Sequence, residues 1–77
     1  MPTVNIEGYK FRFWASDRGE PPHVHVMRGE KMAKIWIQAG TVEYNHGYNS
    51  PEPNRIVKLT RQNQTTLLEV WNEYFSR

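Results

Sequence analysis

The chain carries two histidines, His23 and His25, one residue apart and directly after two prolines in the segment DRGEPPHVHV. Imidazole changes its charge near neutral pH, and its neutral form is a common metal ligand. Asp17, at the start of the same segment, adds a carboxylate. The pattern therefore has three interpretations: a general acid and base that exchange protons, a Zn²⁺ or Mn²⁺ site with Asp17, or a structural pair hydrogen-bonded to the preceding loop.

Alternation along the expected strands assigns the histidines to one face of a sheet, because side chains two residues apart lie on the same side. One face is apolar and is the expected core: it collects Phe11, Phe13, Val24, Val26, Ile35 and Ile37. The other face is basic and aromatic: it collects Lys10, Arg12, Trp14, His23, His25, Met27, Lys34, Trp36 and Gln38. We expect both histidines to face outward, beside Arg12, Trp14 and Trp36.

This second face combines cations for phosphates, rings for stacking and imidazoles for proton transfer, which single-stranded RNA binding or cleavage would use. The expected RNA-binding residues are Lys10, Arg12, Trp14, Lys34 and Trp36, and the expected catalytic residues are His23, His25 and Asp17. Cleavage would be independent of metal, with Arg12 and Lys34 stabilising the phosphate charge. In the alternative, Trp14 and Trp36 form a cross-strand pair and the charges only solvate an open sheet face. Whether the protein is an enzyme, and whether it holds a metal or cofactor, stays open.

The sequence predicts that strands, followed by helices, position these residues. Strands are expected over residues 3–6, 9–15, 23–28 and 31–38, with an edge strand over 41–44 and tight turns at Glu7-Gly8 and Gly29-Glu30. A polar, irregular connection follows at about 45–53. Helical periodicity over about 54–75 predicts two helices, with Asn63 as an N-cap, although one kinked helix fits as well.

Together these elements predict one α+β domain over residues 1–77, an antiparallel meander of four or five strands covered on one face by two C-terminal helices. The absence of cysteine excludes disulfides and thiolate metal sites. No apolar run approaches the roughly 20 residues of a membrane span, and no signal peptide is evident, so we expect a cytoplasmic protein. The net charge of +2 permits a polyanionic partner. Two further basic features are the helical stripe Arg55, Lys58 and Arg61, and His46 as an accessory residue.

Several of these features also occur in a known family. The opening MPTV, the basic and aromatic second strand, Asp-x5-His-x-His with its paired prolines, the Gly-Glu turn and the closing LLEVW resemble DUF4160, a short bacterial domain of unknown function. The tract TVEYNHGYNSPEPN departs from the family pattern, so nothing carries over to it.

The resemblance implies a small stand-alone protein that forms one half of a two-gene, toxin–antitoxin-like module, and it names no settled activity. It implies RNA, or a small protein encoded by a neighbouring gene, as partner. A non-enzymatic protein-binding module is therefore the alternative to an RNA-directed protein.

Overall fold

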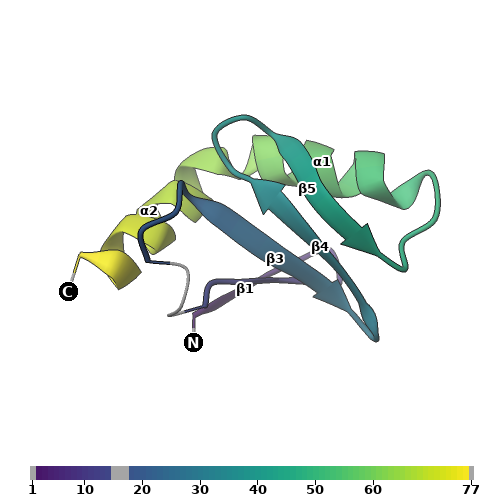
Figure 1. The fold of residues 1–77 in the computed structure, drawn as a ribbon, viewed down its shortest axis with the longest axis horizontal. Helices are drawn as coiled ribbons and strands as arrows, with labels where there is room; N and C mark the ends of the chain where they lie inside the picture. Colours follow the sequence, from purple (N-terminus) through teal and green to yellow (C-terminus); the bar gives the residue numbers. More distant parts are fainter. Residues whose placement is uncertain (1, 15–17, 77) are drawn as a thin grey trace.

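The computed structural model describes residues 2–14 and 18–76 of the chain. Five strands form one antiparallel sheet in sequence order, and two helices follow them (Figure 1). The strands are β1 (Thr3–Ile6), β2 (Tyr9–Arg12), β3 (His23–Arg28), β4 (Lys31–Trp36) and β5 (Thr41–His46). The predicted α+β meander is confirmed.

Tight turns at the predicted positions set the register of two hairpins. Glu7 and Gly8 both have positive φ, 48° and 86°, as a two-residue turn with the twist of its flanking strands requires. Gly29, with φ of 61°, opens the second turn, which is closed by the pair Arg28 and Lys31. Two expected strands are shorter than predicted. β2 ends at Arg12, and β4 ends at Trp36, where the Ile37 amide instead donates to the Pro22 carbonyl at 3.0 Å.

The C-terminal part forms two helices rather than one. Helix α1 spans Glu52–Gln62 and α2 spans Gln64–Phe75, with Asn63 between them. Asn63 occupies the N-cap position of α2 but makes no side-chain cap hydrogen bond there. Its side-chain amide donates to the Leu59 carbonyl at 2.8 Å, so it closes α1 instead of opening α2 as expected. No helix in the described part of the chain is long and apolar enough to cross a membrane.

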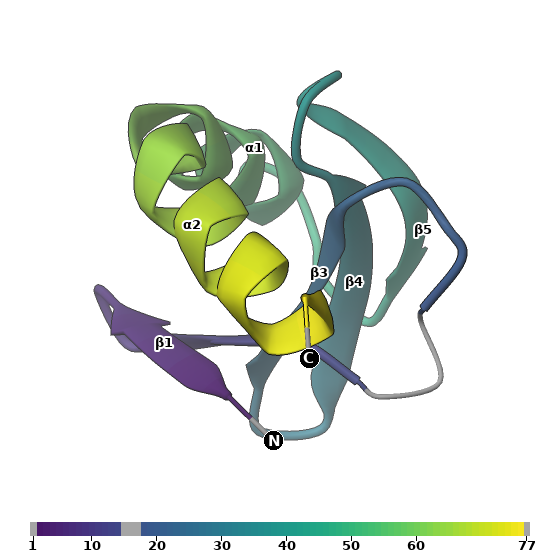
Figure 2. The same cartoon turned by 90° about the vertical axis from the view of Figure 1, so that its left-hand side faces the viewer.

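The core lies between the sheet and the two helices, which both cover the same face (Figure 2). All six residues predicted for the core have zero exposure. The helices add four side chains to it: Ile56, Leu59, Leu67 and Trp71. Since each large apolar side chain contributes about 1.5–3 kcal/mol when buried, this layer is the main source of stability.

Candidate functional site

A row of side chains from four strands crosses the sheet on the face away from its apolar core. The register pairs Arg12 with His25, His25 with Lys34, and Lys34 with Tyr44. In the neighbouring rows His23 pairs with Trp36, and Lys10 pairs with Met27. The sheet register thus brings the predicted strand residues of this face together. We call Lys10, Arg12, Trp14, His25, Lys34, Trp36 and Tyr44 the polar face.

His25 lies under an aromatic cover within this face. The Trp14 ring stacks on the imidazole with centroids 3.8 Å apart and an interplanar angle of 9°. Tyr44 lies across the sheet, with its hydroxyl oxygen 3.3 Å from His25 Nδ1. Only 3% of His25 is exposed. The stacked ring and the tyrosine therefore hold this imidazole in one orientation.

His23 is more deeply enclosed and its tautomer is set by the backbone. Nδ1 lies 2.9 Å from the Pro21 carbonyl oxygen, and because a carbonyl only accepts, Nδ1 carries the proton and donates. The imidazole packs against Trp36 at 5.3 Å and against Trp71 of α2 at 5.2 Å, measured between ring centroids. His23 thus joins the two sides of the sheet at the beginning of β3.

The expectation that both histidines face outward is wrong, since His23 is 0% and His25 3% exposed. Alternation assigned the side of the sheet correctly but not what covers it. Among the described residues, no strand pairs with His23 beyond the end of β2 at Arg12, and the Trp71 ring of α2 packs against this imidazole. Residues 20–22 also lie against the sheet, held by the Lys34–Glu20 ion pair at 2.8 Å and by the Pro22 carbonyl.

The cations of the polar face differ in the contacts that they make with other residues of the protein. Lys34 bonds Glu20 and lies over the Trp36 ring, with Nζ 4.7 Å from the centroid. Lys10 is exposed and Arg12 half-buried, and within residues 2–14 and 18–76 the buried Arg12 Nε has no hydrogen-bond partner. Among the described residues, Lys10 and Arg12 are therefore the cations of this face that form no ion pair.

The two indoles of the polar face do not pair with each other, in contrast to the alternative interpretation in which Trp14 and Trp36 form a cross-strand pair. Trp14 stacks on His25, whereas Trp36 packs against His23 and donates from Nε1 to Glu43 at 2.9 Å. The two imidazoles, 5.2 Å apart between centroids, thus connect the indoles. Asp17 lies outside the described residues. Among the residues that the structure does describe, no group of three or more His, Asp or Glu side chains could hold a metal ion, and the site with Asp17 stays a prediction.

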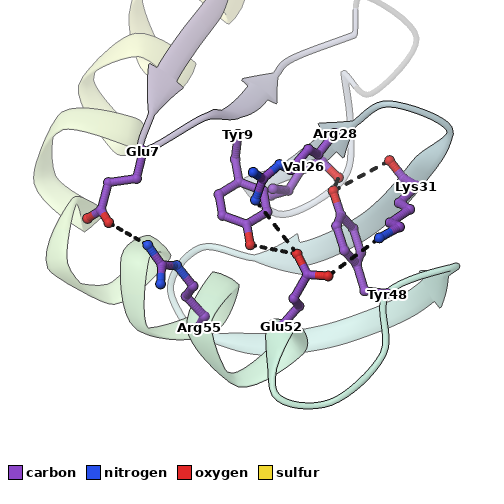
Figure 3. A network of polar contacts seen from close by, with 8 residues as sticks. All are labelled: Glu7, Tyr9, Val26, Arg28, Lys31, Tyr48, Glu52 and Arg55. Atoms are coloured by element: carbon purple, nitrogen blue, oxygen red, sulfur yellow. Dashed lines mark hydrogen bonds and ion pairs between the residues drawn. The ribbon is translucent and has the colours of Figure 1, made fainter.

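A second polar region lies at the opposite end of β3, where the hairpin turns meet the start of α1 (Figure 3). It is an open hollow of about 1260 Å³. Glu52, the first residue of α1, points into it and accepts a hydrogen bond from the Tyr9 hydroxyl at 2.9 Å. Arg28 Nη1 and Lys31 Nζ lie 3.9 and 3.6 Å from the same carboxylate. Three cations and three carboxylates line the hollow, namely Arg28, Lys31 and Arg55 with Glu7, Glu30 and Glu52, and we call it the charged hollow.

Two tyrosines near the charged hollow, Tyr9 and Tyr48, are neutral hydrogen-bond donors. Burial raises the pKa of Tyr48 to about 12, and its hydroxyl donates to the Val26 carbonyl at 3.0 Å. Burial also raises the pKa of Tyr9, with its bond to Glu52 acting in the same direction. That hydrogen bond is the main cause that lowers the pKa of Glu52, and the charges of Lys31 and Arg28 add to it. Glu52 is therefore an anion across the neutral pH range.

The sequence did not reveal the charged hollow. Tyr9 and Glu52 are 43 residues apart, and Glu52 lies within the tract that the sequence predicts as irregular, where no periodicity indicates the direction of a side chain. His46, which the sequence offered as an accessory residue, does border the hollow. The available signal was the concentration of Arg28, Lys31 and the Gly29-Glu30 turn at one hairpin end.

The fold and these two regions define a small α+β domain with an antiparallel meander and a helical layer. The family model described as "Domain of unknown function (DUF4160)" matches residues 8–72 of the 77, and the chain belongs to this family. The match confirms the resemblance expected from the sequence, and it includes the Pro-Pro-His-x-His segment. Neither the curated proteins nor the solved structures yielded a match.

Proposed function

We propose that this protein binds single-stranded RNA on its polar face, as one component of a toxin–antitoxin-like two-gene module. The observation that supports the proposal is the cross-strand row, in which Arg12 and Lys34 flank His25 on the sheet face opposite the core. Trp14 and Trp36 are half-buried beside it, which leaves part of each indole accessible. Cations for the backbone and rings for the bases are the two elements of single-strand recognition.

The ion pair between Lys34 and Glu20 determines which cations of the polar face contact RNA first. Its ammonium group bonds the Glu20 carboxylate at 2.8 Å, so a phosphate competes with Glu20 there. Lys10 and Arg12, for which the described residues provide no ion pair, supply the first phosphate contacts. Binding should then weaken with salt, because each neutralised phosphate releases condensed counterions.

For the histidines we propose a positioning role in this binding. Trp14 stacks on His25, and Trp36 packs against His23, so the imidazoles hold both indoles in place. Proton transfer by His23, His25 and Asp17 stays a prediction from the sequence. The His23 Nδ1 proton is committed to the Pro21 carbonyl, which favours the positioning role over proton exchange.

Fluorescence anisotropy with a labelled single-stranded RNA tests the proposal. Lys10→Gln with Arg12→Gln should weaken binding and lower the slope of log Kd against log salt by about two, one for each phosphate contact removed. The matched control is Lys58→Gln with Arg61→Gln, which removes the same charge from α1 and should leave the slope within about 0.5 of wild type. Equal losses in both variants, or no binding by wild type, would refute a specific RNA site.

The same RNA, followed on a denaturing gel, separates binding from cleavage. We expect it to stay intact during incubation with the purified protein. If it is cut, His25→Gln distinguishes the two roles of the histidine: loss of cutting with retained binding supports proton transfer and refutes a purely positioning role.

One observation favours a protein-binding module as a second candidate. Strand β5 is an edge of the sheet, and its Val42 is a large hydrophobic residue that is 38% exposed. Exposed edges bind extended segments of other proteins by adding a strand. This candidate predicts a stable complex with the neighbouring gene product that Val42→Lys disrupts, and no RNA binding above that of the control variants.

A further inference from the structure

We infer that the outer edge of β1 binds an extended segment of another protein as an added strand, and that a lysine or arginine of this segment pairs with Glu73. The inference is independent of RNA binding and concerns the edge of the sheet opposite to β5. In the described part of the chain, β1 pairs only with β2, so its other side is open.

The main chain of β1 offers hydrogen-bonding groups to such a strand. The Phe13 amide donates to the Pro2 carbonyl at 3.3 Å, so this carbonyl faces β2. The direction of the main-chain groups alternates along a strand of an antiparallel pair. Every second residue after Pro2 therefore also faces β2, whereas the residues between them, Thr3 and Asn5, point their N–H and C=O groups outward.

An apolar margin beside this edge fits alternate side chains of the added strand. Val4 and Ile6 are half-buried and pack against the core, on the side of the sheet that the helices cover (Figure 2). A small crevice of about 170 Å³ lies between the beginning of the chain's first strand and α2. Its lining residues are Pro2, Val70, Glu73 and Tyr74. Apolar side chains of an added strand would lie next to Val4 and Ile6 and extend this margin.

Strand β1 is better suited to an added strand than β5, the other edge of the sheet. The register of β1 with β2 is regular over all four residues of β1, none of which is charged. The register of β5 shifts between Lys34 and Ile35 of β4, and β5 contains Glu43. Bulges and charges at an edge oppose the addition of a strand. The regular, uncharged edge is therefore the one at which we expect it.

Glu73 indicates the charge of the partner. This carboxylate is exposed at the mainly apolar crevice and forms no ion pair with the residues that the structure describes. Helix α2 contains no lysine or arginine, so no cation on the helix offsets a carboxylate near its C-terminus, where the helix dipole is also negative. A cation from the partner would compensate both.

The direction of the added strand determines the position of this cation. A strand antiparallel to β1, as all neighbours in the sheet are, has its C-terminal end beside Pro2. The residue opposite Pro2 lies on the same face as those opposite Val4 and Ile6, because side chains two residues apart share a face. The matching segment thus has apolar residues at two alternate positions and a lysine or arginine two residues later.

A second copy of this chain does not supply that charge. Strand β1 is followed by Glu7, so two antiparallel β1 strands would bring Glu7 of the second copy to the end at which Glu73 lies. Two carboxylates would repel each other there. The expected occupant is therefore a segment of a different protein.

The experiment titrates the isotopically labelled full chain with two capped peptides, Val-Thr-Val-Thr-Lys and Val-Thr-Val-Thr-Glu, and follows the backbone amide shifts. The lysine peptide should shift the amides of Thr3–Asn5 and Val70–Tyr74, and should bind about threefold more tightly than the glutamate peptide. Glu73→Lys should reverse this preference. Glu30→Lys, at an exposed carboxylate of the β3–β4 turn, is the matched control and should leave the preference unchanged.

A proline variant tests the main-chain hydrogen bonds. Asn5→Pro removes an outward amide without removing a bond to β2, and should weaken binding of the lysine peptide about fivefold. Asn5→Thr keeps this amide and should bind within about twofold of wild type.

Each other outcome would overturn the inference. No binding by wild type, equal affinity for the two peptides, or shifts confined to β5 would exclude an added strand at β1 with a cation beside Glu73. A dimer of the free protein that Asn5→Pro dissociates would replace the foreign segment by a second copy. Should Asn5→Pro fail to fold, Glu73→Lys decides, because an unchanged peptide preference in that variant contradicts the inference.

Discussion

The two ends of β3 show opposite uses of polar side chains. At its start, His23 and His25 are enclosed by the rings of Trp14, Trp36 and Trp71 and are almost fully buried. At its end, Arg28 lies in an open hollow with a carboxylate and a lysine. This difference shows that a conspicuous spacing such as His-x-His marks a buried, closely packed position as readily as a catalytic site.

The largest expected effect tests the first region as a structural cluster. His23→Ala should lower the free energy of unfolding by about 2–4 kcal/mol, because it leaves a cavity between Trp36 and Trp71 and removes the hydrogen bond to Pro21. Urea denaturation measures this loss. His46→Ala, at an exposed histidine, is the matched control and should cost at most about 0.5 kcal/mol. Similar losses at the two positions would contradict the structural role of His23.

A smaller effect tests the buried hydrogen bond of Tyr48, a core residue near the second region. Tyr48→Phe removes a buried hydroxyl that donates to the Val26 carbonyl, and should cost about 1–1.5 kcal/mol in urea denaturation. Tyr74→Phe, at a half-buried tyrosine of α2, provides the control and should change stability by less than about 0.5 kcal/mol. A neutral result at Tyr48 would mean that this hydrogen bond contributes no net stability.

The pH dependence of stability sharpens the comparison further, because Glu52 belongs only to the second region. Its pKa lies below the ordinary 4.5 in the folded state, chiefly through the Tyr9 hydrogen bond. The ionised carboxylate therefore contributes stability above about pH 4.5, and this contribution is lost as the pH falls through the lowered pKa. Thermal melts between pH 5 and 3, compared with those of Glu52→Gln, should show a smaller acid-induced decrease in the variant. Parallel decreases would exclude this linkage.

The smallest effect concerns the rim of the charged hollow. The Glu7–Arg55 ion pair is short, at 2.8 Å, but both side chains are 56% exposed. A double-mutant cycle with Glu7→Gln and Arg55→Gln should give a coupling energy of at most about 0.5 kcal/mol. A coupling above about 1 kcal/mol would show that this rim contributes to the fold, in contrast to our view of it as an open surface.

Much of the fold follows from local patterns. Alternation at Phe11, Val24 and Ile35 selects the buried face, and the Glu7-Gly8 and Gly29-Glu30 turns set the hairpin registers. Strand ends were less predictable, since they depend on contacts that no local pattern contains. The Pro22 carbonyl, for example, takes the Ile37 amide after β4 has ended.

The candidate sites were predictable only in part, for a related reason. Alternation correctly places His25 beside Arg12 and Lys34, because strand geometry determines the side of the sheet. It carries no information on the rings that cover the imidazole, such as that of Trp14, because Trp14 lies beyond the end of β2. The contact between Tyr9 and Glu52 depends on where α1 begins after an irregular connection, and strand or helix periodicity does not determine that position.

The most direct test of the account is a nuclear magnetic resonance titration of the isotopically labelled protein with a 10-nucleotide single-stranded RNA. The account predicts that backbone amide shifts change along Lys10–Arg12, Lys34–Trp36 and around Tyr44. The exposed side of α1, with Lys58 and Arg61, should not respond. Changes confined to that helix, or no changes at RNA concentrations well above that of the protein, would contradict RNA binding on the polar face.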